Sequence, residues 1–105
     1  MKKEINKTSK RKLSDIVVTD HYEIIANGKN VYFGMCEMEA AAARIIQACK
    51  NAKAFSRNFC AYDFGIGAEL NGFLELIYYG WMDRDGIDNG FFIPNEKFWN
   101  KIFEK

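Results

Sequence analysis

Two short apolar runs early in the chain flank a dipeptide that is typical of tight turns. Residues 22–25 read Tyr-Glu-Ile-Ile, residues 31–33 read Val-Tyr-Phe, and Asn27-Gly28 lies between them. This dipeptide accepts positive φ at both central turn positions, which matches the twist of two paired strands. The pattern therefore predicts a β-hairpin, and residues 16–18 (Ile-Val-Val) are expected to add a short edge strand.

After the hairpin the spacing of apolar residues changes to that of a helix. Glu37 and Glu39 lie near the expected positive end of this helix and Lys50 near its negative end, as the helix dipole favours. We therefore predict a long amphipathic helix over residues 36–52, with Cys49 as a small hydrophobic residue of its buried side. The buried stripe is expected to contain Met38, Ala42, Ile45, Ile46 and Cys49.

Two further helices are predicted on either side of a glycine turn. Ser56 is a suitable N-cap for a short helix over residues 57–64, which the glycines of residues 65–67 would end. A third helix is expected over residues 68–79, followed by Gly80 as a left-handed stop. Its predicted buried stripe has helical spacing and consists of Leu70, Phe73, Leu74, Ile77 and Tyr78.

A second hairpin and a final helix complete the predicted order. Residues 81–82 and 91–93 are extended candidates around the turn-rich segment 83–90, and Pro94-Asn95 starts a helix with Trp99, Ile102 and Phe103 on its apolar side. A chain of 105 residues has room for one core. We therefore expect a single α+β domain over residues 14–105 and a flexible basic arm over residues 1–13, which show no apolar periodicity.

This order of elements resembles that of a winged helix-turn-helix domain. Residues 59–67 (Phe-Cys-Ala-Tyr-Asp-Phe-Gly-Ile-Gly) look like that family's second helix and turn. Residues 74–84 (Leu-Glu-Leu-Ile-Tyr-Tyr-Gly-Trp-Met-Asp-Arg) look like the end of its third helix running into the wing. The leading hairpin is similar to that of response-regulator effector domains. The resemblance covers residues 22–93 and implies a small winged-helix-like domain with an N-terminal β-hairpin, three helices, a C-terminal hairpin (wing) and a final helix.

The charge of the chain is divided unevenly along its length. The net charge is +1, but residues 1–12 carry six basic side chains and one acidic one. Between Asn58 and Glu96 there are seven acidic residues and one basic residue. DNA binding depends on contacts to phosphates and on basic or amide side chains that read bases. A DNA-reading helix and wing with this net negative charge should therefore repel a duplex. Only Asn71 and Arg84 fit the DNA-contacting pattern of the family.

The first functional hypothesis is therefore a non-enzymatic protein-binding regulator or inhibitor, which presents an acidic helix–wing face to a partner with a basic surface. By analogy with phage-encoded inhibitors, that partner would be a host protein that handles nucleic acid. Tyr79 and Leu76 lie off the predicted buried stripe and are expected to be apolar anchors. The predicted partner-binding residues are Glu69, Asn71, Glu75, Leu76, Tyr79, Asp83, Arg84 and Asp85.

The alternative is a DNA-binding transcriptional regulator of winged-helix type, acting as a dimer, in which the basic arm contacts phosphates. The same arm is equally compatible with a solvated, solubilising tail. The basic residues around the end of the first helix are likewise compatible with ordinary exposed positions. The residues predicted to contact nucleic acid or an acidic partner are Lys2, Lys3, Lys7, Lys10, Arg11, Lys12, Lys53 and Arg57.

The sequence lacks the residue patterns that metal sites, cofactors and catalysis require. The cysteines are an odd set without a Cys-x-x-Cys pair, and His21 is the single histidine, which argues against zinc and for a reducing compartment. Asp83, Asp85 and Asp88 do not have the spacing of a calcium loop. Residues 65–67 lack the third glycine of a dinucleotide-binding motif. We therefore expect neither enzyme activity nor a cofactor.

No stretch of the sequence reaches the roughly 20 apolar residues that a membrane-spanning helix needs. The apolar run that follows the basic N-terminus is also too short for the core of a signal peptide. A cytoplasmic protein is the expectation.

Overall fold

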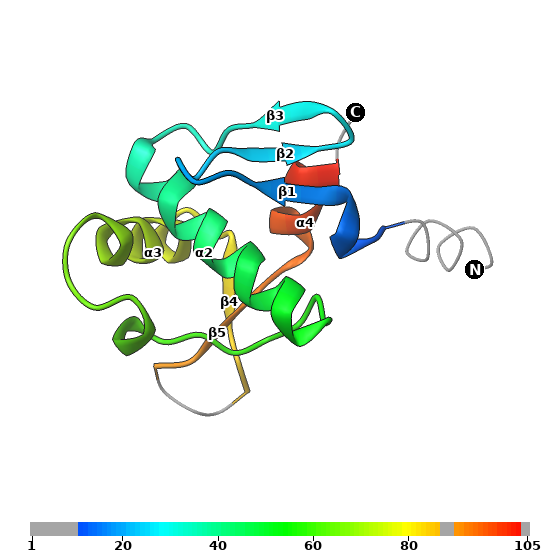
Figure 1. The fold of residues 1–105 in the computed structure, drawn as a ribbon. Coiled ribbons are helices and arrows are strands. Elements are labelled where there is room, and N and C mark those ends of the chain that lie inside the picture. Colours follow the sequence, from blue (N-terminus) through cyan, green and yellow to red (C-terminus); the bar gives the residue numbers. More distant parts are fainter. Residues whose placement is uncertain (1–10, 87–89, 104–105) are drawn as a thin grey trace.

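The computed structural model describes residues 11–86 and 90–103 (Figure 1). Its elements in chain order are the 3-10 turn η1 (Leu13–Asp15), the strands β1 (Ile16–Val18), β2 (Ile24–Ala26) and β3 (Lys29–Val31), helix α2 (Cys36–Ala52), the 3-10 turn η2 (Ala61–Asp63), helix α3 (Ala68–Tyr78), the strands β4 (Met82–Arg84) and β5 (Phe92–Pro94), and helix α4 (Glu96–Phe103). The described residues thus form a small α+β domain with three α-helices and two antiparallel sheets, which confirms the predicted class.

The first sheet has the order β1-β2-β3, with both neighbouring pairs antiparallel. Its hairpin closes at the pair Ala26–Lys29, and both turn residues have positive φ, 54° at Asn27 and 78° at Gly28. The predicted hairpin and edge strand are therefore confirmed, although β2 and β3 lie closer to the turn than the apolar runs suggested. The Lys50 ammonium donates a hydrogen bond to the Ile16 carbonyl and so joins α2 to the edge strand.

The core lies between this sheet, α2 and the two later helices (Figure 1). Every residue of the stripe predicted for α2 is buried, and the helix has the predicted bounds. Phe33, just after β3, stacks on Phe98 of α4 at 5.3 Å between ring centroids. Trp99 of α4 donates its indole N–H to the Phe55 carbonyl at 3.2 Å. The first contact places α4 against the end of the first sheet, and the second joins it to the segment after α2.

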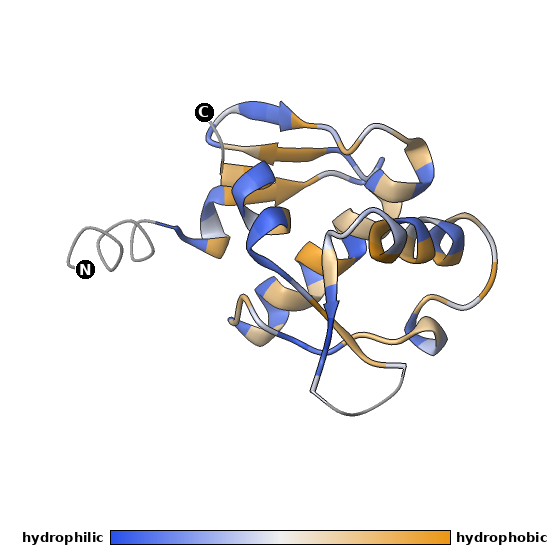
Figure 2. Ribbon diagram, turned by 180° about the vertical axis from the view of Figure 1, so that it is seen from behind, coloured by the Kyte–Doolittle hydropathy of each residue, from blue (hydrophilic) through white to orange (hydrophobic). Residues whose placement is uncertain are grey.

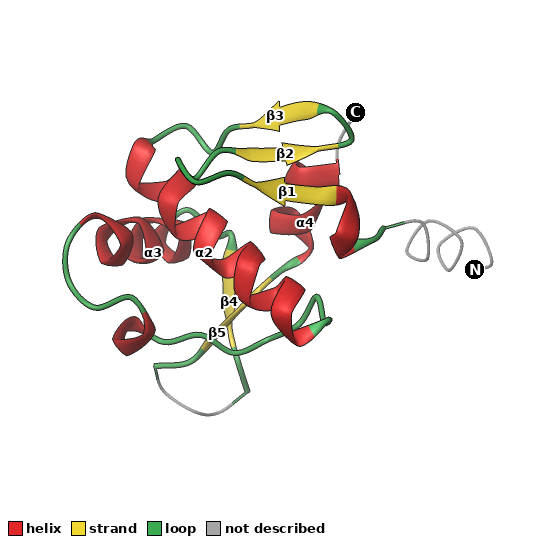
Figure 3. Ribbon diagram, viewed as in Figure 1, coloured by secondary structure: helices red, strands yellow, loops and turns green. Residues whose placement is uncertain are grey.

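The short helix predicted over residues 57–64 is wrong, because only the single turn η2 forms between α2 and α3 (Figure 3). Phe59 instead exchanges two backbone hydrogen bonds with Phe92, at 2.8 and 2.7 Å, which keeps the chain extended there. The Asp63 carboxylate accepts the Cys60 N–H at 3.0 Å and closes the turn. Gly65, with φ of 68°, then leads the chain away from a helical path.

Helix α3 has nearly the predicted bounds, but its buried face is rotated from the predicted stripe. Of the predicted stripe, Phe73 is buried and Leu70 and Ile77 are partly buried against the core, whereas Leu74 and Tyr78 face solvent. Gly72 and Leu76 are buried in their place. Hydrophobic positions recur along the whole of α3 in Figure 2, so its apolar residues outnumber those that one face can bury. The position of α2 therefore decides which of them enter the core.

The predicted second hairpin and final helix are present, but β4 includes Asp83 and Arg84, which were predicted to lie in the turn. β4 and β5 pair antiparallel with Met82 opposite Pro94, while residues 87–89 of the connecting turn, Asp88 among them, lie outside the described residues. Asn95 begins α4, since its side-chain oxygen accepts the Phe98 N–H at 3.1 Å. Its amide nitrogen also donates to the Gly80 carbonyl at 2.7 Å, which fixes α4 against the turn that ends α3.

Candidate functional site

The inner face of α3 packs on the first turn of α2 at very short range. A Cβ atom at Gly72 would lie 1.8 Å from the Glu37 carbonyl oxygen, so only glycine allows this approach. Phe73, the next residue, stacks on Phe64 at 4.3 Å between ring centroids. Leu76, one turn later, is completely buried. The rotation of α3 about its axis follows from these contacts.

The outer face of α3 consequently presents large apolar side chains to solvent. Leu74 and Tyr78 lie one turn apart and are 49% and 79% exposed, and Tyr79 is half-exposed with its ring 5.0 Å from that of Tyr78. Before α3, Tyr62 of η2 and Ile66 of the following loop are 95% and 92% exposed. We call these five residues the α3 outer surface. Large apolar side chains that gather in the exposed part of one helix and the segment before it are typical of interaction sites.

Of the two predicted anchors, Tyr79 is exposed and Leu76 is not. Leu76 has no exposed surface, because it lies on the side of α3 that packs against the core, and its prediction as a binding residue is wrong. Leu74 and Tyr78, which were predicted to be buried, take its place at the surface. The sequence indicated that α3 has more apolar residues than one buried face can hold, so some of them had to be exposed. The pattern could not show which of them the neighbouring elements of the fold would cover.

The remaining predicted partner-binding residues lie on α3 and at the start of the second hairpin. Asn71 is exposed and Glu75 is partly exposed on α3. Asp83 on β4 is exposed and accepts a hydrogen bond from the Asn95 amide at 3.0 Å. Arg84 is exposed as well, and Asp85 is partly exposed with its N–H bonded to the Phe91 carbonyl at 2.9 Å. These residues share one stretch of chain, from α3 through β4.

Cations from distant parts of the chain reduce the negative charge of this stretch. Arg44 of α2 forms an ion pair with Glu69 in the first turn of α3 at 2.6 Å and covers the Phe64 ring. The Lys97 ammonium donates to the Tyr79 carbonyl at 2.9 Å and lies 4.4 Å from the centroid of the Trp81 ring. The stretch is therefore less acidic than its own sequence indicates, although Asp63, Glu75 and Asp83 remain available at its surface.

The residues predicted to bind nucleic acid are only partly described. Lys2, Lys3, Lys7 and Lys10 lie outside the described residues. The Arg11 side chain is 15% exposed, because it pairs with Glu96 at 2.9 Å, donates to Asn100 and covers the Phe103 ring. Arg11 is thus engaged with α4 rather than presented to a partner.

The other three basic candidates are exposed. Lys12 precedes η1, and Lys53 ends α2 in a left-handed conformation with φ of 56°. Arg57 lies over the Phe59 ring, 4.8 Å from its centroid. Lys53 and Arg57 follow the C-terminal end of α2, whereas Gly72 of α3 packs on the first turn of that helix.

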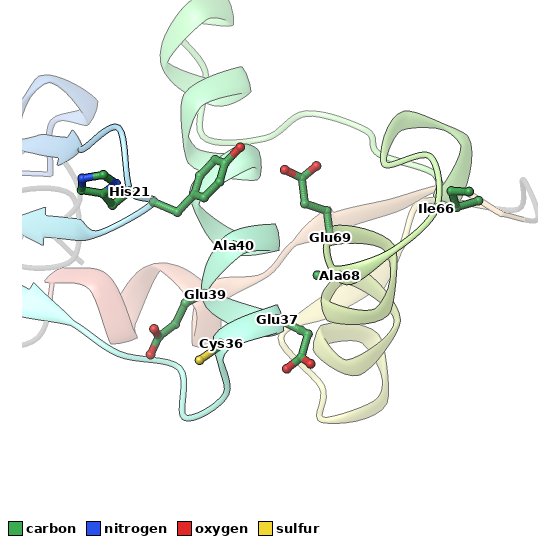
Figure 4. Close-up of a pocket in the computed structure, with 9 residues that line it drawn as sticks. His21, Cys36, Glu37, Glu39, Ala40, Ile66, Ala68 and Glu69 are labelled. Atoms are coloured by element: carbon green, nitrogen blue, oxygen red, sulfur yellow. The ribbon is translucent and has the colours of Figure 1, made fainter.

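A groove opens beside the first turns of α2 and α3 (Figure 4). Its volume is about 640 Å³, and the connection between β1 and β2 forms its third side. Thr19 organises that connection, since its hydroxyl accepts the N–H groups of His21 and Glu23, and Tyr22 is held there at φ of 65°. The lining residues are His21, Tyr22, Cys36, Glu37, Glu39, Ala40, Ile66, Ala68 and Glu69.

The three glutamates of the groove stand on different sides of it and do not converge on one point (Figure 4). The Glu39 carboxylate is used internally, as the acceptor of the Phe33 N–H at 3.3 Å. Within the part of the chain that the structure describes, no three His, Cys, Asp or Glu side chains are grouped to hold a metal ion.

The three cysteines are free thiols in different surroundings. Cys36 is exposed at the groove, Cys60 is partly exposed, and Cys49 is buried in the core as predicted. Burial raises the pKa of the Cys49 thiol from 9.0 to about 12, against a smaller opposing effect of the Arg57 charge. Cys49 is therefore protonated and unreactive at neutral pH.

Comparisons of the chain with models of protein families, with curated proteins and with solved structures find no match. Among the described residues, no helix combines the length and the apolar character that crossing a membrane requires.

Proposed function

We propose that this chain is a non-enzymatic protein-binding regulator or inhibitor, and that the α3 outer surface is the site at which it binds its partner. The observation that carries this proposal is the exposure of Leu74 and Tyr78 on a helix whose opposite face buries Gly72, Phe73 and Leu76, together with two exposed apolar side chains in η2 and the loop before α3. The winged-helix interpretation belongs to the same proposal, because η2, α3 and the β4–β5 hairpin follow in the order of that family's second helix, third helix and wing.

The energetics favour a protein surface as the partner of these side chains. Full burial of a leucine-sized side chain is worth about 1.5–3 kcal/mol, and tyrosine is among the residues that dominate binding hot spots. Leu74 and Tyr78 are adjacent on the helix surface, so one partner surface can bury both. Tyr62 of η2 and Ile66 of the following loop would extend the same contact.

The charges around this surface favour a basic partner. Asp63 lies beside Tyr62, Glu75 lies beside Leu74, and Asp83 follows the end of α3. Carboxylates at the rim of an apolar site attract a basic partner and speed its association. Arg11, Arg44 and Lys97 of the described domain already contact carboxylates, a carbonyl or aromatic rings, which argues against a duplex as the ligand of this domain.

A photo-cross-linker at position 78 tests the proposal. Tyr78 is replaced by p-benzoylphenylalanine in the protein expressed in its native cells, and Tyr32, also an exposed tyrosine but one that follows β3, receives the same replacement as a control. We expect a protein adduct at position 78 that is not formed at position 32. The captured protein is then identified by mass spectrometry and purified for binding measurements.

The purified partner should bind the parent chain at least about tenfold more tightly than the Leu74→Asp variant, because that change puts a charge into the apolar contact. Leu74 is exposed, so the fold should tolerate the change. Equal binding by parent and variant would refute the assignment of the surface. In parallel, micromolar binding to random duplex that falls steeply with salt and is lost on deleting residues 1–12 would favour the DNA-binding alternative.

A further inference from the structure

The groove beside α2 and α3 adjoins the α3 outer surface, since Ile66 belongs to both. Its walls are mostly carbon, from Ala40, Ala68 and Ile66 together with the ring of Tyr22, and carboxylates stand around its rim. A long aliphatic chain that ends in a positive charge matches this combination of surfaces. Among protein side chains only lysine and arginine have that form.

The balance of charge at the groove is negative. Three glutamates contribute three negative charges, and Arg44 compensates one of them through its ion pair with Glu69. The N-terminal ends of α2 and α3 add about half a positive charge each. Since these partial charges compensate only about one further carboxylate, a net negative field remains, which favours a cation and disfavours a phosphate or carboxylate ligand.

The Arg44–Glu69 pair shows how the rim can receive a guanidinium. The Arg44 side chain is itself 47% exposed, and its guanidinium meets the Glu69 carboxylate at 2.6 Å while lying 5.3 Å from the centroid of the Phe64 ring. Glu37, by contrast, forms neither of the two ion pairs found among the described residues. Its carboxylate is therefore available to a second cation from outside the chain.

We propose that a lysine or arginine side chain of the protein partner enters this groove, with its aliphatic part against Ala40 and Ala68 and its charged end at the Glu37 rim. This inference rests on the proposed function and specifies the partner. The segment that binds carries apolar side chains, which contact Leu74 and Tyr78, and a basic residue further along, which reaches the groove past Ile66. Binding of that segment then depends on the charge of one side chain as well as on its apolar contacts.

The test uses short capped peptides that differ at one position and present it between leucines. That position is arginine, its neutral isostere citrulline, or glutamate. Amide chemical shifts of the full chain are followed by NMR during titration. We expect the arginine peptide to shift the amides of Glu37, Ala40 and Ala68 and to bind about fivefold more tightly than the citrulline peptide, as one exposed ion pair allows. The glutamate peptide should bind most weakly.

Two variants assign the effect to the groove. Glu37→Gln should weaken the arginine peptide about threefold and leave the citrulline peptide unchanged. Ala68→Trp should fill the groove and prevent binding of all three peptides, and Gln47→Trp, at an exposed position of α2 that does not line the groove, should leave binding as it is.

Equal affinities of the arginine and citrulline peptides, shifts confined to other parts of the chain, or no shifts at millimolar peptide would each overturn the inference. Tighter binding of the glutamate peptide would instead identify the groove as an anion site and overturn it as well. A protein adduct at position 78 together with any of these results would leave the proposed function standing without the groove. If no protein adduct forms at position 78 but the arginine peptide binds in the groove as expected, only the proposed function is refuted.

Discussion

Replacing Gly72 by alanine should destabilise the protein strongly, although alanine is normally the better residue inside a helix. Helix propensity alone would favour alanine by about 1 kcal/mol. At this position, however, the new Cβ would lie 1.8 Å from the Glu37 carbonyl oxygen and 2.4 Å from its carbonyl carbon, where ordinary contact begins at 3.4 Å. Both atoms belong to the backbone of α2, so no change of side-chain rotamer can relieve the contact.

The size of the effect follows from what must move. The two helices have to separate, which loosens the packing of Phe73 and Leu76 between them. Overpacking a core costs about 1–3 kcal/mol, and loosening two large core residues adds to that cost. After the gain in helix propensity, we expect a net loss of about 2–4 kcal/mol. For a domain of this size that corresponds to a fall in Tm of roughly 10–20 °C.

Thermal and urea unfolding followed by circular dichroism measure this loss. Asn71→Ala is the matched control, because it makes an alanine at the neighbouring, exposed position of α3 and should be neutral or stabilising by about 0.5 kcal/mol. A Gly72→Ala variant as stable as the parent would show that α2 and α3 do not cross as described. The outward orientation of Leu74 and Tyr78, which depends on that crossing, would then be refuted too.

Three further predictions test the core and the cysteines. Leu76→Ala should cost about 2–5 kcal/mol because Leu76 is completely buried, and Leu74→Ala should cost less than about 1 kcal/mol, as unfolding in urea would show; equal losses would contradict the described rotation of α3. Because the pKa of Cys49 is raised from 9.0 to about 12, only the unfolded thiol ionises readily between these pH values. The contribution of Cys49 to the free energy of unfolding should therefore be fully present below pH 9.0 and fall towards about pH 12, by at most about 1.4 kcal/mol per pH unit. Cys49→Ala should lack this component of the pH dependence, and the same slope in the variant would count against it. In the native protein, exposed Cys36 should react with a thiol reagent at neutral pH while Cys49 does not.

The elements that were predicted correctly depend on contacts close in sequence. Asn27-Gly28 specifies its turn through the φ angles of two adjacent residues, and the buried stripe of α2 is a simple helical repeat with polar residues on the other side. In both cases local chemistry and the final fold agree. Such segments can be assigned from the sequence without knowledge of the neighbours.

The errors arose where distant contacts decide. Phe59 was expected in a helix, but its backbone pairs with Phe92, and no local pattern indicates that partner. The face of α3 was misassigned because apolar residues surround the helix and the choice between them depends on a backbone contact to Glu37. The acidic character of the α3 region was overestimated for the same reason, since Arg44 reaches Glu69 from another helix.

The close crossing of α2 and α3 connects the core of this protein to its proposed binding surface. The sequence predicted a buried stripe of α3 that included Leu74 and Tyr78. It does not form, because the space against Glu37 admits only a glycine, and placing Gly72 there turns Leu74 and Tyr78 outward. The same backbone contact that completes the core thus holds these two side chains ready for a partner. Binding can bury them without rearranging the fold, so little of the binding free energy is spent on ordering α3.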